Sequence, residues 1–183
     1  FSETFSHYLV ETTAGGGSDT PENDASAEAV IFVTGGTLRL TIDGTAHDMV
    51  AGGYAFVPAG AAWSLHATGS TPAVWHWIRK RYVPAEGVSA PDAFVTSDAD
   101  ASPIPMPDCD GLWATTRFVD PADMRHDMHV NIVTFQPGGC IPFAETHVME
   151  HGLFILQGTG DYLLNTSWVE VARTNFQGKQ NDK

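Results

Sequence analysis

Residues 139–158 read GCIPFAETHVMEHGLFILQG, and the fold and the chemistry that we expect follow from this segment. Five residues separate Gly139 from Glu145, then come His147 and His151, and six more residues lead to Gly158. Because alternate side chains of a strand share a face, the three ligand-type side chains are expected to point into one barrel interior. Carboxylate and imidazole are ligands that manganese, iron, nickel and zinc accept. The stretch therefore predicts a divalent metal site at Glu145, His147 and His151.

The same frame occurs once more, about 123 residues earlier in the chain. The positions that correspond by this offset are, in order, Gly16, Glu22, Asp24, Glu28 and Gly35. The preceding segment also agrees, since SHYLVETTAGGG at 6–17 aligns with HVNIVTFQPGGC at 129–140. An internal repeat of this kind predicts two similar structural units.

Both copies consist of short apolar runs separated by turn signals such as GG, DG, GTG and PGG, which is typical of β-strands. The sequence therefore predicts an all-β fold of two tandem double-stranded β-helix, or jelly-roll, domains. We expect a first domain at 1–83, a linker at 84–108 that is rich in Pro, Ala, Ser and Asp, and a second domain at 109–183. The second domain is expected to be incomplete at its C-terminus, because counterparts of 52–60 fall at 175–183 without similarity.

The first copy has a different set of side chains at the ligand positions. Glu22, Asp24 and Glu28 supply three carboxylates and no histidine, and Trp63 stands where a fourth ligand is expected. Three carboxylates could bind a hard cation. The lack of an imidazole favours the other interpretation, in which the first copy is structural.

The segment His147-Val-Met-Glu150-His151 also matches H-x-x-E-H, a zinc-peptidase signature that needs both histidines on one face of a helix. The flanking residues favour a strand instead. Pro137, Gly138 and Pro142 precede the segment, and Gly152 and the strand-like LFIL follow it.

The net charge of −13 argues against binding to nucleic acid or anionic lipid, and no apolar run approaches the length of a membrane span. The short basic run Arg79-Lys80-Arg81 is expected to be solvated or to meet an acidic surface of another subunit. Two cysteines, Cys109 and Cys140, are too few for a disulfide scaffold and favour a reducing, cytoplasmic location.

The glycine frame G-x5-[HE]-x-H-x3-[HE]-x6-G resembles the first cupin motif, and Gly52-x5-Pro58-x-Gly60 resembles the second. Two longer strings, FAETHVMEHGLFILQGTGDYLLNTSWVEV at 143–171 and RKRYVPAEG at 79–87, resemble the (S)-ureidoglycine aminohydrolase family, also called glyoxylate-induced proteins. That resemblance implies a bicupin that uses manganese. It also implies release of ammonia from ureidoglycine to give ureidoglycolate during allantoin breakdown.

By the same resemblance, the metal ligands are Glu145, His147 and His151. Tyr162 corresponds to a tyrosine that contacts the substrate, and Glu145 is the ligand expected to carry a proton as well. The only partners implied are a small-molecule substrate and further copies of the chain in a homo-oligomer.

The family's glutamine ligand and C-terminal lysine have no secure counterpart, because Gln177 and Lys179 lie at the wrong distance. Two other functions stay open from the sequence. One is a non-catalytic cupin that binds a metal or a small ligand, and the other is a cupin dioxygenase.

Overall fold

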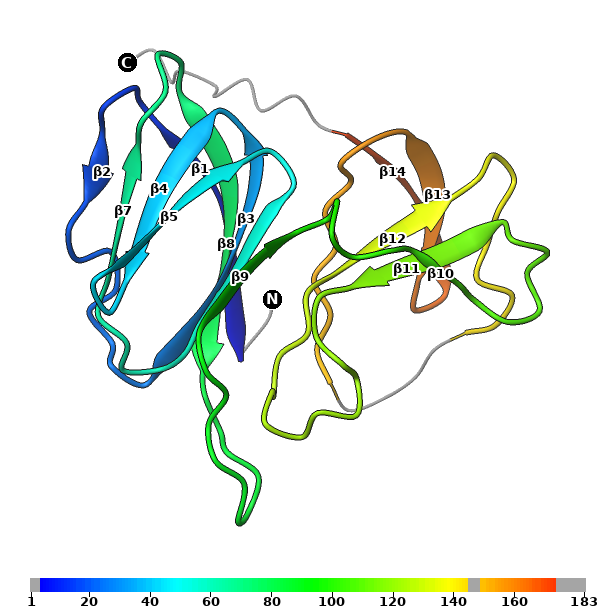
Figure 1. The fold of residues 1–183 in the computed structure, drawn as a ribbon. Helices are drawn as coiled ribbons and strands as arrows, with labels where there is room; N and C mark the ends of the chain where they lie inside the picture. Colours follow the sequence, from blue (N-terminus) through cyan, green and yellow to red (C-terminus); the bar gives the residue numbers. More distant parts are fainter. Residues whose placement is uncertain (1–3, 145–148, 174–183) are drawn as a thin grey trace, which may run out of the picture. The chain divides into compact units, whose positions relative to one another are not determined.

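The computed structural model describes residues 4–144 and 149–173, and within these ranges every regular element is a β-strand (Figure 1). The strands are β1 (Phe5–Thr12), β2 (Gly17–Ser18), β3 (Ala27–Gly35), β4 (Thr37–Ile42), β5 (Thr45–Val50), β6 (Gly53–Val57), β7 (Trp63–Ala67), β8 (Ala73–Arg81), β9 (Phe94–Ser97), β10 (Ile104–Pro105), β11 (Trp113–Arg117), β12 (Asn131–Phe135), β13 (Thr159–Leu164) and β14 (Ser167–Ala172). The all-β prediction is confirmed for this part of the chain. The chain divides into two compact units, residues 1–148 and 149–183.

The first unit contains two larger antiparallel sheets. One has the strand order β1-β8-β3-β6-β9, and the other has the order β2-β7-β4-β5. Non-consecutive strands are neighbours in both sheets, as expected for a jelly roll. Strand β9 lies within 84–108, which the sequence predicted as a linker, and it pairs with β6. Part of that segment therefore extends the first sheet.

The main core lies between the two sheets, where a face of each contributes apolar side chains. Burial alternates along β4 and β7, because only one face of each strand points inward. The side chains of this inner cluster are Ala29, Ile31, Val33, Leu38, Leu40, Ile42, Met49, Ala55, Val57, Trp63, Leu65, Ala67, Ala73 and Trp75.

Strands β3 and β6 are buried on their other face as well. This outer cluster consists of Val30, Phe32, Tyr54, Phe56 and Ile78, packed against Phe5, Phe94, Phe118, Met128, Val130 and Ile132. The rings of Tyr54 and Phe118 stack with their centroids 4.1 Å apart. Residues 118–132 therefore cover the outer face of the first sheet.

Smaller sheets follow later in the chain. Strands β10, β11 and β12 form a three-stranded antiparallel sheet in the first unit, and β13 and β14 form a hairpin in the second unit. The described residues include no helix with the length and apolar character needed to cross a membrane.

The hairpin β13–β14 repeats the hairpin β4–β5 residue for residue. Thr159 to Leu164 pair with Ala172 to Ser167 in the same register in which Thr37 to Ile42 pair with Val50 to Thr45. The first turn residue has a positive φ in both, 46° at Asp43 and 56° at Asn165. Each residue of the second hairpin thus lies 122 positions after its counterpart, as Thr159 lies after Thr37.

Candidate metal centre

The structure describes only one of the three predicted metal ligands, His151. Glu145 and His147 lie outside the described residues, so the predicted grouping of Glu145, His147 and His151 stays a prediction. His151 is described and lies in the second unit with an exposed side chain. The segment 151–155, which we expected to be a strand, has neither strand nor helical assignment. The helical alternative therefore receives no support in the part that the structure describes.

The turn before the ligand segment keeps the offset of 123 that the sequence suggested. Gly15 and Gly138 have positive φ values of 73° and 81°. The next amide closes the turn in both copies, because Gly16 N donates to Thr13 O and Gly139 N donates to Gln136 O, each at 2.8 Å.

The turn after the ligand segment follows the offset of 122 instead. Gly36 and Gly158 directly precede β4 and β13 and have positive φ values of 71° and 83°, whereas Gly35 does not. At Gly36 an added Cβ would lie 2.5 Å from Pro72 O, so glycine is required there. The ligand segment is therefore one residue shorter in the second copy, and the alignment of Gly35 with Gly158 is wrong.

This shift changes which residue corresponds to His151. Counted back from the turn glycine, the counterpart is Ala29 rather than Glu28. Ala29 is 3% exposed and belongs to the inner cluster, whereas Glu28 is 1% exposed and faces the outer cluster. By this count, His151 corresponds to an inward-facing position of the first copy, although its own side chain is exposed. Tyr162 corresponds to Leu40, which also belongs to the inner cluster.

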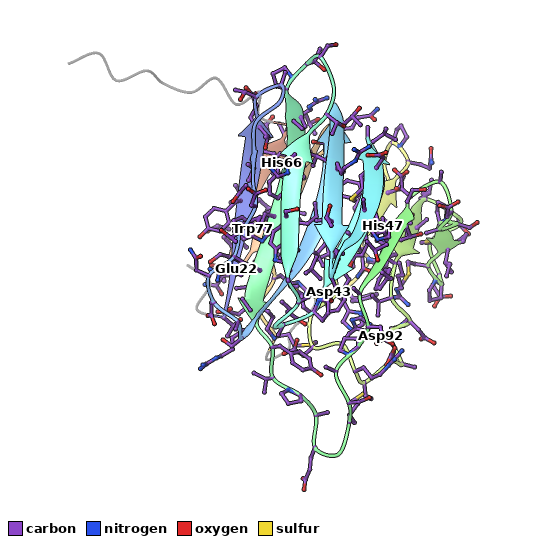
Figure 2. All side chains as sticks on the ribbon, turned by 60° about the vertical axis from the view of Figure 1, so that its left-hand side comes forward. Glu22, Asp43, His47, His66, Trp77 and Asp92 are labelled. Carbon is purple, nitrogen blue, oxygen red and sulfur yellow. The ribbon has the colours of Figure 1, made fainter. Side chains whose placement is uncertain are left out.

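In the first copy, Arg79 donates hydrogen bonds to Glu22, the residue at the first ligand position. Arg79, on β8, donates from Nη2 to Glu22 Oε1 at 2.8 Å and from Nε to Glu22 Oε2. The guanidinium also lies 5.8 Å from the centroid of the Trp77 ring, and Figure 2 labels both of its contacts, Glu22 and Trp77. Sequence reasoning expected the run from Arg79 to Arg81 to be solvated or to meet another subunit. The alternation of side chains along β8 was the signal that could have placed Arg79 on the same face of the strand as Trp77.

The other ligand positions of the first copy are also unsuited to a metal. Asp24 accepts hydrogen bonds from the hydroxyl and the amide of Ser26, and these bonds lower the pKa of Asp24. Ala29 carries no donor atom, and Trp63 is buried in the inner cluster. Within the described ranges, no group of three or more His, Cys, Asp or Glu side chains could hold a metal ion. This geometry favours a structural first copy.

We expect Glu22→Gln to leave the metal content of the protein unchanged, because Arg79 already neutralises Glu22. The lost bidentate pair should lower the free energy of unfolding by about 1–2 kcal/mol. Elemental analysis and urea denaturation measure the two effects, with Glu11→Gln as a control at an exposed strand position. A metal content that falls to half would show instead that the first copy holds an ion.

A second buried polar group lies on the outer face of the first sheet. Lys80 Nζ donates to Asp127 Oδ2 at 2.7 Å, and the same oxygen accepts the amide of Val83 at 2.8 Å. Burial, together with a hydrogen bond to Asp127, raises the pKa of Glu28 to about 9. Glu28 is therefore protonated at neutral pH. No local pattern points to Asp127, which is far from Glu28 in the chain.

Comparisons with known proteins give a consistent picture. Residues 8–79 match the cupin domain family model. The chain is 28% identical to the (S)-ureidoglycine aminohydrolase of Escherichia coli over 94% of this chain and 65% of that protein. It is 31% identical to a probable (S)-ureidoglycine aminohydrolase of Oryza sativa over 91% of this chain and 52% of that protein.

Among solved structures, a putative glyoxylate-induced protein from Pseudomonas aeruginosa is 58% identical, with a TM-score of 0.88. The match covers 94% of this chain and 64% of that one. The chain therefore spans less than two thirds of the length of each of these relatives, although each match covers more than 90% of the chain itself.

Proposed function

Because this chain is a cupin related to the (S)-ureidoglycine aminohydrolases, we propose that it belongs to an enzyme that hydrolyses (S)-ureidoglycine to ureidoglycolate and ammonia. The similarity over 94% of the chain, which includes the segment from Glu145 to Tyr162, carries this proposal. The comparison of the two copies supports it, because His151 and Tyr162 correspond to Ala29 and Leu40, which both belong to the inner cluster of the first copy.

The residues of the second copy suit a divalent cation such as Mn²⁺. Glu145, His147 and His151 would hold it, since one carboxylate and two imidazoles are a donor set that manganese accepts. The first copy, by contrast, has Asp24 and Ala29 in place of the two histidines. A bound cation would supply Lewis-acid polarisation and leave open positions for the substrate.

The chain's own residues would then position the substrate and move a proton. The Tyr162 hydroxyl would hydrogen-bond the substrate. Glu145 would take a proton from the attacking water and pass it to the departing amine. The carbon–nitrogen bond breaks, a carbon–oxygen bond to the water oxygen forms, and the amine leaves as ammonia.

The test measures ammonia from freshly prepared (S)-ureidoglycine with the full-length protein, before and after removal and return of Mn²⁺. We expect ammonia release that depends on the metal. Oxygen consumption would indicate a dioxygenase, and tight metal binding without turnover would indicate a binding module. Either outcome would contradict the proposal.

The remaining expectations about organisation belong to the same proposal. We propose a bicupin with domains at 1–83 and 109–183. The matched hairpins β4–β5 and β13–β14 support this division. A cytoplasmic homo-oligomer is the expected assembly, and size-exclusion chromatography with light scattering tests the subunit number.

A further inference from the structure

A hollow of about 310 Å³ lies in the first unit, where the start of β9 meets the segment that follows β11. Its lining side chains come from within residues 91–94 and 118–126, and the structure describes all of them. Figure 2 labels one of these residues, Asp92, just before β9. Sites for small molecules begin at about this volume. The hollow is therefore large enough for a small organic ligand.

His126 lines this hollow, and its side chain is only 5% exposed. The imidazole lies edge-on to the rings of Phe56 and Phe94, with centroids 4.7 Å and 6.2 Å away. Nδ1 is buried and has no hydrogen-bond partner among the described residues. Nε2 lies 3.9 Å from Oδ2 of Asp123, another lining residue, which is too long for a hydrogen bond. Because buried polar groups are normally paired, this imidazole lacks a partner that a ligand could supply.

The charges around the hollow favour a cation. Arg125 donates from Nε and Nη2 to the carboxylate of Asp123, and these bonds hold the pKa of Asp123 at about 2. That pair is neutral as a whole. Asp92 and Asp120 add two negative charges and form no ion pair among the residues that the structure describes. Burial lowers the pKa of His126, so its imidazole is neutral at pH 7 and does not offset them.

The distance between His126 and Asp123 suits an ammonium group. A neutral imidazole has one acceptor nitrogen, and a carboxylate oxygen is also an acceptor. One ammonium nitrogen can donate to two acceptors that lie 3.9 Å apart, at about 2.8 Å from each. Phe94 and Phe118 give the hollow an apolar wall, which also suits an organic cation. A metal ion is less suited, because the described ranges contain no group of three or more His, Cys, Asp or Glu that could hold one.

We infer that this hollow binds a small primary ammonium ligand with an apolar body, whose nitrogen donates to His126 Nε2 and Asp123 Oδ2. Asp92 and Asp120 attract the charge, and the phenylalanine rings contact the apolar body. The inference does not depend on the proposed function, because every residue that carries it lies in the first unit.

The test is calorimetric binding of 2-phenylethylammonium to the full-length protein, with 2-phenylethanol as a neutral probe of the same shape. We expect saturable binding of the ammonium at one site and binding of the alcohol at least tenfold weaker. His126→Phe keeps a ring against Phe56 and Phe94 and should weaken ammonium binding by about tenfold or more, because a hydrogen bond to a charged group is lost. Asp92→Asn should weaken it about two- to fivefold, as expected for an exposed charge. Asp19→Asn removes an exposed carboxylate elsewhere and is the matched control.

Absence of saturable ammonium binding would overturn the inference and leave the hollow to water. Equal affinity for the ammonium and the alcohol would also overturn it, since the hollow would then recognise only the apolar body. Unchanged binding in His126→Phe would have the same meaning. Urea denaturation checks that each variant folds, and His126→Phe should be no less stable, because it removes a buried nitrogen without a partner. If His126→Phe does not fold, the comparison of Asp92→Asn with Asp19→Asn decides.

Discussion

Replacing His151 with alanine is expected to lower the affinity for Mn²⁺ by roughly 100-fold or more and to abolish ammonia release at the same time. The expectation follows from the proposed ligand set, in which loss of one of three protein donors leaves the cation two protein donors and water. Even neighbours that only orient a ligand change metal affinity by about 10- to 100-fold, so loss of a ligand should cost at least as much.

Two further variants make this result specific. His151→Glu should retain metal, because the cupin motif accepts a carboxylate at this position and carboxylates bind manganese well. His66→Ala removes a histidine from β7 of the first copy, where it lies 3.4 Å from Asp19, and should leave metal and activity unchanged. Elemental analysis and ammonia assays measure both properties. Full metal content in His151→Ala would remove this residue from the ligand set.

Glu28→Gln is expected to stabilise the protein at alkaline pH. Both carboxylate oxygens of Glu28 are buried and receive no hydrogen bond from an N–H or O–H donor, and the same holds for the neighbouring Asp127 Oδ1. A proton shared between the two carboxyl groups supplies the missing hydrogen bond. Although burial opposes it, hydrogen bonds from Glu28, Lys80 and Val83 hold the pKa of Asp127 below its ordinary value. Glu28 therefore carries the proton.

The sign of the pH dependence follows from this assignment. The pKa of Glu28 is about 9 in the folded protein and 4.5 for an ordinary glutamate, so between these values only the folded state holds the proton. Stability falls as pH rises through this window, at ~1.4 kcal/mol per pH unit from this group, and levels off above it. Glutamine keeps the donor toward Asp127 and has no proton to lose.

Urea denaturation from pH 5 to pH 9 measures the effect. The difference between Glu28→Gln and the unmodified protein should grow with pH and reach several kcal/mol near pH 8. Glu11→Gln, an exposed position on β1, is the matched control and should show no such trend. Parallel curves for Glu28→Gln and the unmodified protein would contradict a shared proton. Lys80, Tyr54 and Tyr82 also interact with this pair, so their variants are unsuitable as controls.

The sequence predicted the class of fold and the repeat, because turn glycines and alternating apolar residues are local signals. The alignment of the two copies from sequence was wrong by one residue after the ligand segment. The adjacent glycines Gly35 and Gly36 look equivalent as letters, and only the backbone shows that Gly36 makes the turn. A one-residue shift moves a side chain to the other face of a strand, so Glu28 was assigned to the wrong face.

Other features of the site depend on tertiary contacts that no local pattern encodes. The bond between Lys80 and Asp127 joins residues 47 positions apart, and the bond between Arg79 and Glu22 joins residues 57 apart. Neighbours on a strand point to opposite sides, so Arg79 and Lys80 have separate roles despite reading as one basic run. The pairing partner of β9 was likewise invisible in a segment whose composition resembles a linker.

The Arg79–Glu22 pair has a consequence for how the protein depends on its surroundings. A guanidinium attached to the chain cannot dissociate, and its supply does not vary with the manganese concentration of a cell. A dissociable ion, in contrast, stabilises the fold that binds it only in proportion to its availability. Under the proposed ligand set, the stability of the second copy would vary with the supply of Mn²⁺, whereas the Arg79–Glu22 pair contributes equally to the first copy at any manganese concentration.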